Sequence, residues 1–141
     1  MNYYDIYKLV KSEDLNHHGT LFAGRMSEWF VESCFITTAV EYKHPENLVC
    51  VKIQELNFYT PIRKGDIIHI QSKICLLGKT SLTVYGKVTR NNDAKVLVDG
   101  YLTFVCIDEH GCKMNHNLVM DPPTSEEDIK LEARAKSFKK Q

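Results

Sequence analysis

The sequence predicts an α+β fold in which an antiparallel sheet wraps around one long central helix. Two observations predict it. A helical pattern extends over residues 21–42 without a proline, and Gly24 is its only glycine. Strand-like segments then follow almost without a break from Leu48 to Asp108, separated by short turn sequences. The apolar stripe of the helix must be buried, and the concave face of the sheet is its natural partner.

The N-terminal part predicts a strand, a loop and the start of the helix. Residues 3–10 are rich in aromatic and β-branched side chains, which favour a strand. Residues 16–19 predict a loop, and Thr20 is the expected N-cap of the helix. The helix is expected to end near His44-Pro45, because the residue before a proline is pushed out of helical geometry.

A projection at about 100° per residue divides the helix into two faces. The mostly apolar face holds Phe22, Met26, Phe30, Ser33 and Thr37, flanked by Trp29 and Val40. Arg25, Glu28 and Glu32 form a polar stripe beside it. Arg25 is expected to pair with Glu28, three residues on, which leaves Glu32 free for chemistry.

The second half predicts four long strands and a short helix. The strands are residues 48–59, 66–77, 81–89 and 95–107, and three successive hairpins are expected to join them. This pattern is typical of the hot-dog architecture, here a domain over residues 1–120. Residues 121–141 form a tail, in which Thr124 and Glu127 predict a capping box for a helix over about 125–138. That helix is polar nearly all round, so we expect it to be solvated.

Composition excludes several classes of protein. The 18 basic and 18 acidic side chains balance, which argues against a general electrostatic grip on nucleic acid. Five cysteines form no CxxC pair, so free thiols in a reducing compartment are favoured over a disulfide framework or a zinc site. The first residues do not have the pattern of a signal peptide, and no apolar stretch is long enough to cross a membrane. We expect a cytoplasmic protein without a membrane partner.

Three sequence blocks resemble one family, the cytosolic long-chain acyl-CoA hydrolases among the hot-dog thioesterases. The most specific block is Asn16-His-His-Gly-Thr-Leu-Phe-Ala-Gly24, followed by Glu28-Trp-Phe-Val-Glu32. The others are Phe58-Tyr-Thr-Pro-Ile-Arg-Lys-Gly-Asp66 and Gly78-Lys-Thr-Ser-Leu82. The last block is not a phosphate loop, because the upstream glycine of that motif is missing. The resemblance covers roughly residues 5–108.

The resemblance implies an enzyme that hydrolyses acyl-CoA to a free carboxylic acid and CoA. It implies no metal or redox cofactor, since CoA is part of the substrate and product. It also implies a homo-oligomer built from hot-dog dimers, with two helices back to back and composite sites between subunits. Such dimers assemble further into tetramers or hexamers in many of these families.

The catalytic acid departs from the family pattern. Where the family places an aspartate on the helix, followed by a glutamate, this chain has Val31 and then Glu32. One residue along a helix rotates a side chain by about 100°, so either the longer Glu32 reaches the same site or the site has been rebuilt. Glu32 is the candidate base or nucleophile. The backbone N–H groups of Ala23 and Gly24, early in the helix, are candidates to stabilise the oxyanion, with Gly24 preferred; Ala23 stands in place of a family glycine.

Two groups of polar residues complete the expected site. Asn16 and His18 precede the helix, and they are candidates to orient water or the thioester, or else to make turn contacts. Adjacent His17 and His18 point in different directions and lack a nearby acidic or cysteine partner, so no metal site is predicted. The expected substrate-binding residues are Thr20, Ala23, Arg63, Lys79, Thr80, Ser81 and Arg90, the basic ones for the phosphates of CoA.

Two rival functions remain open. A non-catalytic acyl-CoA-binding or sensing protein would keep the pocket without the catalytic acid, and Val31 is the residue that favours it. A hot-dog dehydratase or hydratase normally has a histidine on the helix or at its start. The central helix here contains no histidine, which weighs against this second rival.

Overall fold

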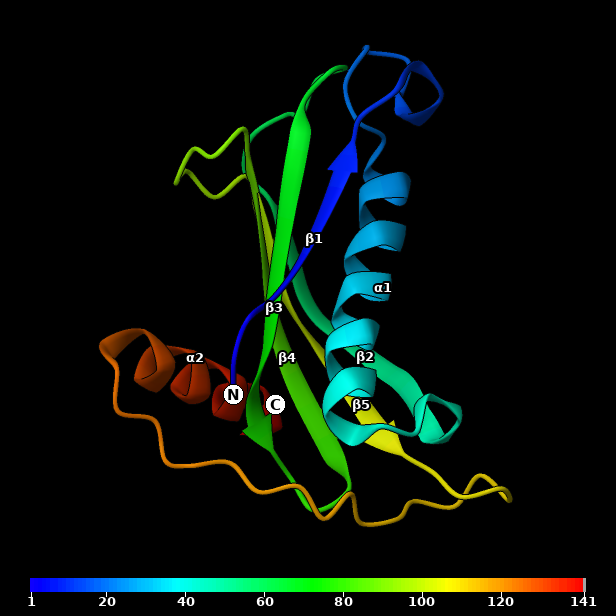
Figure 1. The fold of residues 1–141 in the computed structure, drawn as a ribbon, viewed down its shortest axis with the longest axis vertical. Helices are drawn as coiled ribbons and strands as arrows, with labels where there is room; N and C mark the ends of the chain where they lie inside the picture. Colours follow the sequence, from blue (N-terminus) through cyan, green and yellow to red (C-terminus); the bar gives the residue numbers. More distant parts are fainter. Residues whose placement is uncertain (141) are drawn as a thin grey trace.

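A five-stranded antiparallel sheet lies along the long helix α1, and the short helix α2 lies on the opposite face of the sheet (Figure 1). This computed structural model describes residues 1–140, with side chains through residue 139; Gln141, the end of the expected tail, lies outside the described residues. The strands are β1 (Tyr4–Leu9), β2 (Leu48–Phe58), β3 (Ile67–Leu77), β4 (Ser81–Arg90) and β5 (Val98–Cys106). The helices are α1 (Ala23–Tyr42) and α2 (Glu126–Ser137). The predicted α+β fold class is confirmed.

The strand order corrects one sequence prediction. The sheet runs β1-β3-β4-β5-β2, so β3, β4 and β5 form the expected meander but β2 does not pair with β3. Instead β2 crosses to the far edge and pairs with β5. The connection over residues 59–66 is long enough to cross, and it contacts the start of α1 where the Leu21 N–H donates to the Ile62 carbonyl at 2.7 Å. A turn sequence identifies the end of a strand but not its partner.

Close contact between α1 and the sheet depends on a glycine. Phe30 of α1 is fully buried, and a Cβ built on Gly86 of β4 would lie 2.6 Å from the Cζ atom of Phe30. Any side chain at this position would push the helix away from the sheet. The buried residues of α1 are Met26, Trp29, Phe30, Ser33, Cys34, Thr37 and Thr38, close to the predicted face. Phe22 and Val40, which were also expected on or beside that face, are exposed.

All five cysteines are free thiols. Cys34, Cys75 and Cys106 are buried, whereas Cys50 and Cys112 are exposed. Burial raises the pKa of Cys75 to about 12, and it also raises the pKa of Cys34 and Cys106. Among residues 1–140, no helix is both long and apolar enough to cross a membrane.

The C-terminal helix packs on the sheet rather than projecting into solvent. Leu131, Ala135 and Phe138 are buried against a cluster that includes Tyr85 and Tyr101 on the outer face of the sheet. Their spacing of four and three residues places them on one side of a helix. The expectation of a solvated appendage was therefore wrong. The N-cap is Ser125, whose hydroxyl accepts from the Asp128 N–H at 3.1 Å, rather than the predicted Thr124.

Truncation of one contact residue is expected to destabilise the whole chain. Replacing Leu131 (8% exposed) by Ala is expected to lower the free energy of unfolding by about 2–3 kcal/mol, because it leaves a cavity between α2 and the sheet. Replacing Ile129 (50% exposed) by Ala is the matched control, expected to change it by about 0.5 kcal/mol at most. Denaturant unfolding measures both. Equal effects of the two changes would contradict the docked position of α2.

Candidate active site at the start of the long helix

A cavity of about 250 Å³ lies between the start of α1 and the end of β2. Asn16, Thr20, Leu21, Ala23 and Met26 line it on the helix side, and residues 58–62 with Val98 line it on the sheet side. Three of the predicted site residues, Asn16, Thr20 and Ala23, therefore meet in one cavity. Its walls are largely apolar, with a few polar groups from the loop before the helix, which is typical of sites for small molecules.

The first turn of α1 has no side-chain cap. The N-cap residue is Phe22, in extended geometry (φ −64°, ψ 129°), and it makes no capping hydrogen bond with its side chain. The first backbone hydrogen bond of the helix is Met26 N–H to the Phe22 carbonyl, at 3.0 Å. Within residues 1–140, the N–H groups of Ala23, Gly24 and Arg25 have no hydrogen-bond partner. Unused donors at the positive end of a helix dipole suit an anion or a developing oxyanion.

Thr20 is not the helix cap that the sequence predicted. Its hydroxyl and its backbone N–H bond to the side-chain amide of Asn16, at 3.1–3.3 Å. The Asn16 amide oxygen also accepts from the His18 N–H at 2.9 Å. Gly19 completes the turn with a φ of +81°, a conformation that favours glycine. The loop thus holds its own shape and leaves the helix start uncapped.

The surroundings of His18 and Gly24 differ from those expected for residues that contact the substrate. The His18 side chain is exposed and its ring packs against that of His17, with ring centroids 3.9 Å apart. A Cβ built on Gly24 would lie 2.6 Å from an atom of the Phe22 ring. The space left by this glycine is therefore occupied by Phe22, an exposed side chain, rather than being open to an acyl group.

Arg25 pairs with an aspartate that the sequence reading overlooked. Its guanidinium lies 3.0 Å from a carboxylate oxygen of Asp14, so the predicted Arg25–Glu28 pair is not formed. Asp14 is 2% exposed, and it also accepts from the Lys11 N–H at 2.8 Å. Its backbone carbonyl accepts from the Phe22 N–H at 2.9 Å. Asp14 thus joins the loop to the first turn of α1, and it compensates a cation placed at the positive end of the helix dipole.

Glu32 lies away from the cavity of its own chain. Its side chain is exposed, as is that of Glu28 one turn earlier, whereas Val31 is half-buried against the core. Nine residues separate Glu32 from Ala23, a distance of about 13 Å along the helix axis. Glu28, Glu32, Ile36 and Val40 form an exposed stripe along α1. Glu32 and the helix start of the same chain therefore do not meet at one carbonyl group.

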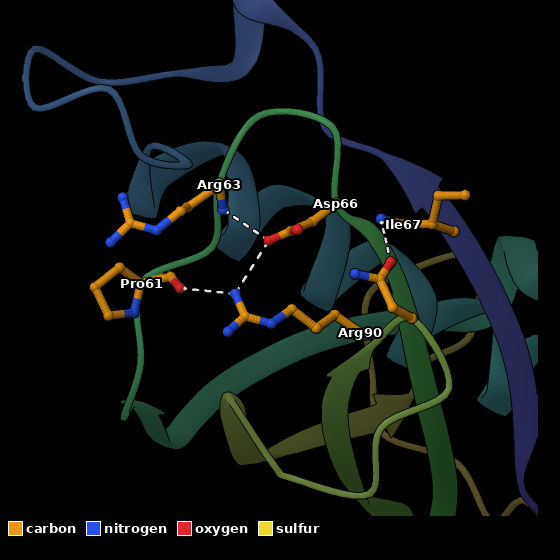
Figure 2. A network of polar contacts seen from close by, with 6 residues as sticks. Pro61, Arg63, Asp66, Ile67 and Arg90 are labelled. Carbon is orange, nitrogen blue, oxygen red and sulfur yellow. Dashed lines mark hydrogen bonds and ion pairs between the residues drawn. The ribbon is translucent and has the colours of Figure 1, made fainter.

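The two arginines near the cavity that are predicted to bind phosphate differ in whether their guanidinium groups are already hydrogen-bonded. The Arg90 guanidinium bonds to the Asp66 carboxylate at 3.1 Å and to the Pro61 carbonyl at 3.4 Å. Figure 2 shows the Arg63 side chain pointing away from Asp66. The Asp66 carboxylate accepts from the backbone N–H of Arg63 at 2.9 Å and not from its guanidinium. Arg63 is exposed and forms a β-bridge with Thr20, so it lies beside the cavity. Arg90 stabilises the turn, and Arg63 is the available cation.

Lys79, Thr80 and Ser81 lie at the other end of the sheet. They form the end of the turn between β3 and β4 and the first residue of β4, while the start of α1 lies beside the connection that leads into β3 (Figure 1). The Gly78 N–H donates to the Ser81 carbonyl at 2.9 Å, and the Thr80 carbonyl accepts from the Cys106 N–H at 2.9 Å. The Lys79 side chain is exposed. A single chain therefore does not bring these residues to the cavity.

The fold and this site together define a class of protein. A long helix on the face of a five-stranded antiparallel sheet, with uncapped N–H groups beside an apolar cavity, is suited to binding an acyl group and stabilising an oxyanion. The chain belongs to the thioesterase superfamily, whose family model matches residues 18–97. Membership confirms the hot-dog thioesterase class that the sequence predicted.

Individual relatives are similar over most of the chain. YkhA of Bacillus subtilis (strain 168), described as an uncharacterized acyl-CoA thioester hydrolase, is 26% identical over 133 residues, which cover 88% of this chain and 75% of the relative. A hexameric acyl-CoA thioesterase is 26% identical with a TM-score of 0.84, over 98% of this chain and 88% of the other. An acyl-CoA hydrolase of Staphylococcus aureus, solved with butyryl coenzyme A and coenzyme A, has the same fold at 22% identity, with a TM-score of 0.85 over 98% and 84%.

Proposed function

We propose that this chain is an acyl-CoA thioesterase that hydrolyses acyl-CoA to a free carboxylic acid and CoA. The observation that carries the proposal is the uncapped start of α1 beside an apolar cavity, in a chain of the thioesterase superfamily. The similarity to acyl-CoA hydrolases supports the choice of CoA as the carrier. The polar substrate and the free cysteines favour the cytoplasm as the compartment.

The proposed chemistry uses backbone donors, one carboxylate and water. The oxygen of a water molecule attacks the thioester carbonyl carbon while Glu32 takes a proton from that water. The carbonyl oxygen becomes an oxyanion, which accepts hydrogen bonds from the N–H groups of Ala23 and Gly24. When the intermediate collapses, the carbon–sulfur bond breaks and the CoA sulfur takes the proton from Glu32. No metal or redox cofactor takes part in these steps.

Two chains are needed to assemble such a site. Glu32 is exposed and lies about 13 Å along the axis from Ala23 of its own chain. A second chain seated on the exposed stripe of α1 would bring another helix start or loop towards Glu32 and exclude water from it. This is the composite site that the sequence resemblance implies, with Asn16 and His18 reaching the neighbouring subunit.

The edge strand β2 is the proposed dimer contact. It is 11 residues long, it ends the sheet, and it exposes Val49, Val51, Ile53 and Phe58. A long apolar edge strand presents free backbone groups to another strand, and natural proteins cover such edges. Pairing with the same strand of a second copy across a two-fold axis covers both edges at once.

Antiparallel pairing of two β2 strands would join the separated halves of the site. β2 runs from the end that holds the β3–β4 turn to the end that holds the start of α1 (Figure 1). A two-fold axis would therefore bring the helix start of one chain and the Lys79–Ser81 turn of the other to the same end of the joined sheet, with β4 and β5 between the turn and the paired edge. Lys79, Thr80 and Ser81 would then bind the CoA whose acyl group lies in the partner's cavity. Further assembly to a hexamer is proposed by analogy with the hexameric relative.

Measurement of CoA release from a panel of acyl-CoAs tests the function directly. The expected result is turnover with a kcat of roughly 1–10³ s⁻¹ on at least one chain length, as is ordinary for enzymes. Tight binding of acyl-CoA with no release above background would contradict the proposal, and it would favour the non-catalytic binding protein. The panel also determines the acyl-chain preference, which depends on the volume of the cavity.

A further inference from the structure

The segment after β5 turns back onto the β3–β4 turn. Ile107 and Lys113 form a β-bridge, and the Met114 N–H donates to the Cys106 carbonyl at 3.0 Å. Two residues later, the His116 N–H donates to the Lys79 carbonyl at 3.3 Å. Residues 113–118, here called the return segment, therefore lie directly against the turn that carries Lys79, Thr80 and Ser81.

The His116 ring fixes this contact. His116 is only 7% exposed, although it lies in a segment without regular secondary structure. One ring nitrogen, Nε2, lies within hydrogen-bond distance of the Gly78 carbonyl oxygen, and the other, Nδ1, accepts from the Leu118 N–H at 2.9 Å. With these partners Nδ1 is the acceptor and Nε2 is the donor. His116 thus holds two consecutive residues of the turn, Gly78 through its ring and Lys79 through its backbone.

An open hollow lies at this contact. It is lined by residues 77–79 at the turn and by residues 115–118 from the return segment, which include Leu77 and Leu118 beside the polar side chains. Lys79, Asn115 and Asn117 are exposed, so an ammonium group and two amides are available to a ligand. Asn117 has a φ of +59°, a left-handed conformation that asparagine tolerates better than most residues. An ammonium group with neighbouring amide donors suits a phosphate, as Lys and neutral donors do elsewhere.

We propose that His116 is a positioning residue for acyl-CoA binding, and that the hollow beside it receives the phosphate-bearing nucleotide end of CoA. The inference rests on the proposed function, in which the Lys79–Ser81 turn binds CoA. His116 does not touch the thioester. It acts through the turn, because its bonds to Gly78 and Lys79 fix the backbone from which the Lys79 side chain projects.

A comparison of two thioesters tests this role. One is an acyl-CoA, and the other is the same acyl group on pantetheine, a shorter thioester that lacks the phosphate-bearing nucleotide. His116→Ala is expected to raise KM for acyl-CoA by roughly five- to tenfold, the effect of losing one or two hydrogen bonds, with kcat unchanged. The kinetic constants for the short thioester should stay the same. His116→Gln, whose amide keeps a donor for the Gly78 carbonyl, is expected to restore most of the affinity.

Surface variants in the hollow cover the case in which His116→Ala fails to fold. Asn115→Asp and Asn117→Asp add a carboxylate at exposed positions, and each is expected to raise KM for acyl-CoA only, because the charge repels a phosphate. Equal losses on both thioesters for His116→Ala, or no effect of either aspartate, would overturn the inference. Lys79→Ala distinguishes failure of this inference from failure of the proposed CoA site on which it rests. If Lys79→Ala also leaves the preference for acyl-CoA over the short thioester unchanged, the proposed CoA site at the turn is wrong.

Discussion

Glu32→Gln is expected to lower kcat for acyl-CoA by roughly 10²–10⁴-fold, the range for loss of a general base. A glutamine has the same size but cannot accept a proton from the attacking water. Because the Glu32 side chain is exposed in the single chain, the change removes no core packing, and we expect an unchanged fold and Tm. Steady-state release of CoA at saturating substrate measures the effect.

Glu28→Gln is the matched control for this change. Glu28 lies one turn earlier on the same exposed stripe of α1, and it also lacks an ion pair with Arg25, which bonds to Asp14. Its replacement is expected to leave kcat within about twofold of the original, because Glu28 takes no part in the proposed proton transfer. An unchanged kcat in Glu32→Gln, or equal losses in both variants, would remove Glu32 from its catalytic role.

Charges on the edge strand are expected to abolish both assembly and activity. Val51 and Ile53 of β2 are 55% and 46% exposed, so replacing both by Asp costs little in the single chain. In a dimer paired through β2, the added carboxylates of the two copies lie close together and repel. We expect a species with the 16.3 kDa mass of one chain in light scattering. We also expect kcat/KM to fall by roughly 10²-fold, because groups from the second chain no longer reach the site.

The control for this variant places the same charge elsewhere. Ile129 on α2 is 50% exposed, and Ile129→Asp is expected to change neither mass nor turnover. Two results would count against the proposal. An oligomer that survives the β2 charges would exclude this edge as the dimer contact. A monomer that keeps full turnover would show that each chain carries a complete site.

Local patterns predicted most of the fold. The long helix was readable because its apolar residues repeat with helical spacing. Its C-cap is Lys43, in a left-handed conformation (φ 70°), next to the predicted end. Long-range pairing was not readable in the same way. The place of β2 beside β5 depends on contacts about fifty residues apart, which no turn sequence encodes. The packing of α2 on the sheet could have been predicted, because the apolar residues Leu131, Ala135 and Phe138 recur at helical spacing.

The sequence predicted which residues belong to the candidate site better than it predicted how those residues are arranged. The sequence block from Asn16 to Gly24 identified the cavity wall, since its residues are neighbours in the chain as well as in space. Asp14 was missed because its partner Arg25 is eleven residues away, across a loop whose path the sequence does not reveal. His116 was missed for the same reason. The role of Thr20 was misjudged because Asn16 competes successfully for its hydroxyl.

The burial of three cysteines has a consequence for an enzyme whose product is itself a thiol. A mixed disulfide forms when a protein thiolate attacks an existing disulfide, such as that of oxidised CoA, and a raised pKa keeps a cysteine in its unreactive protonated form. Cys34, Cys75 and Cys106 are buried, and the pKa of each thiol is raised. We therefore expect them to stay free of mixed disulfides with CoA during turnover. Cys112, which is exposed and lies outside β2, is the position at which a thiol reagent used to follow CoA release would also label the enzyme.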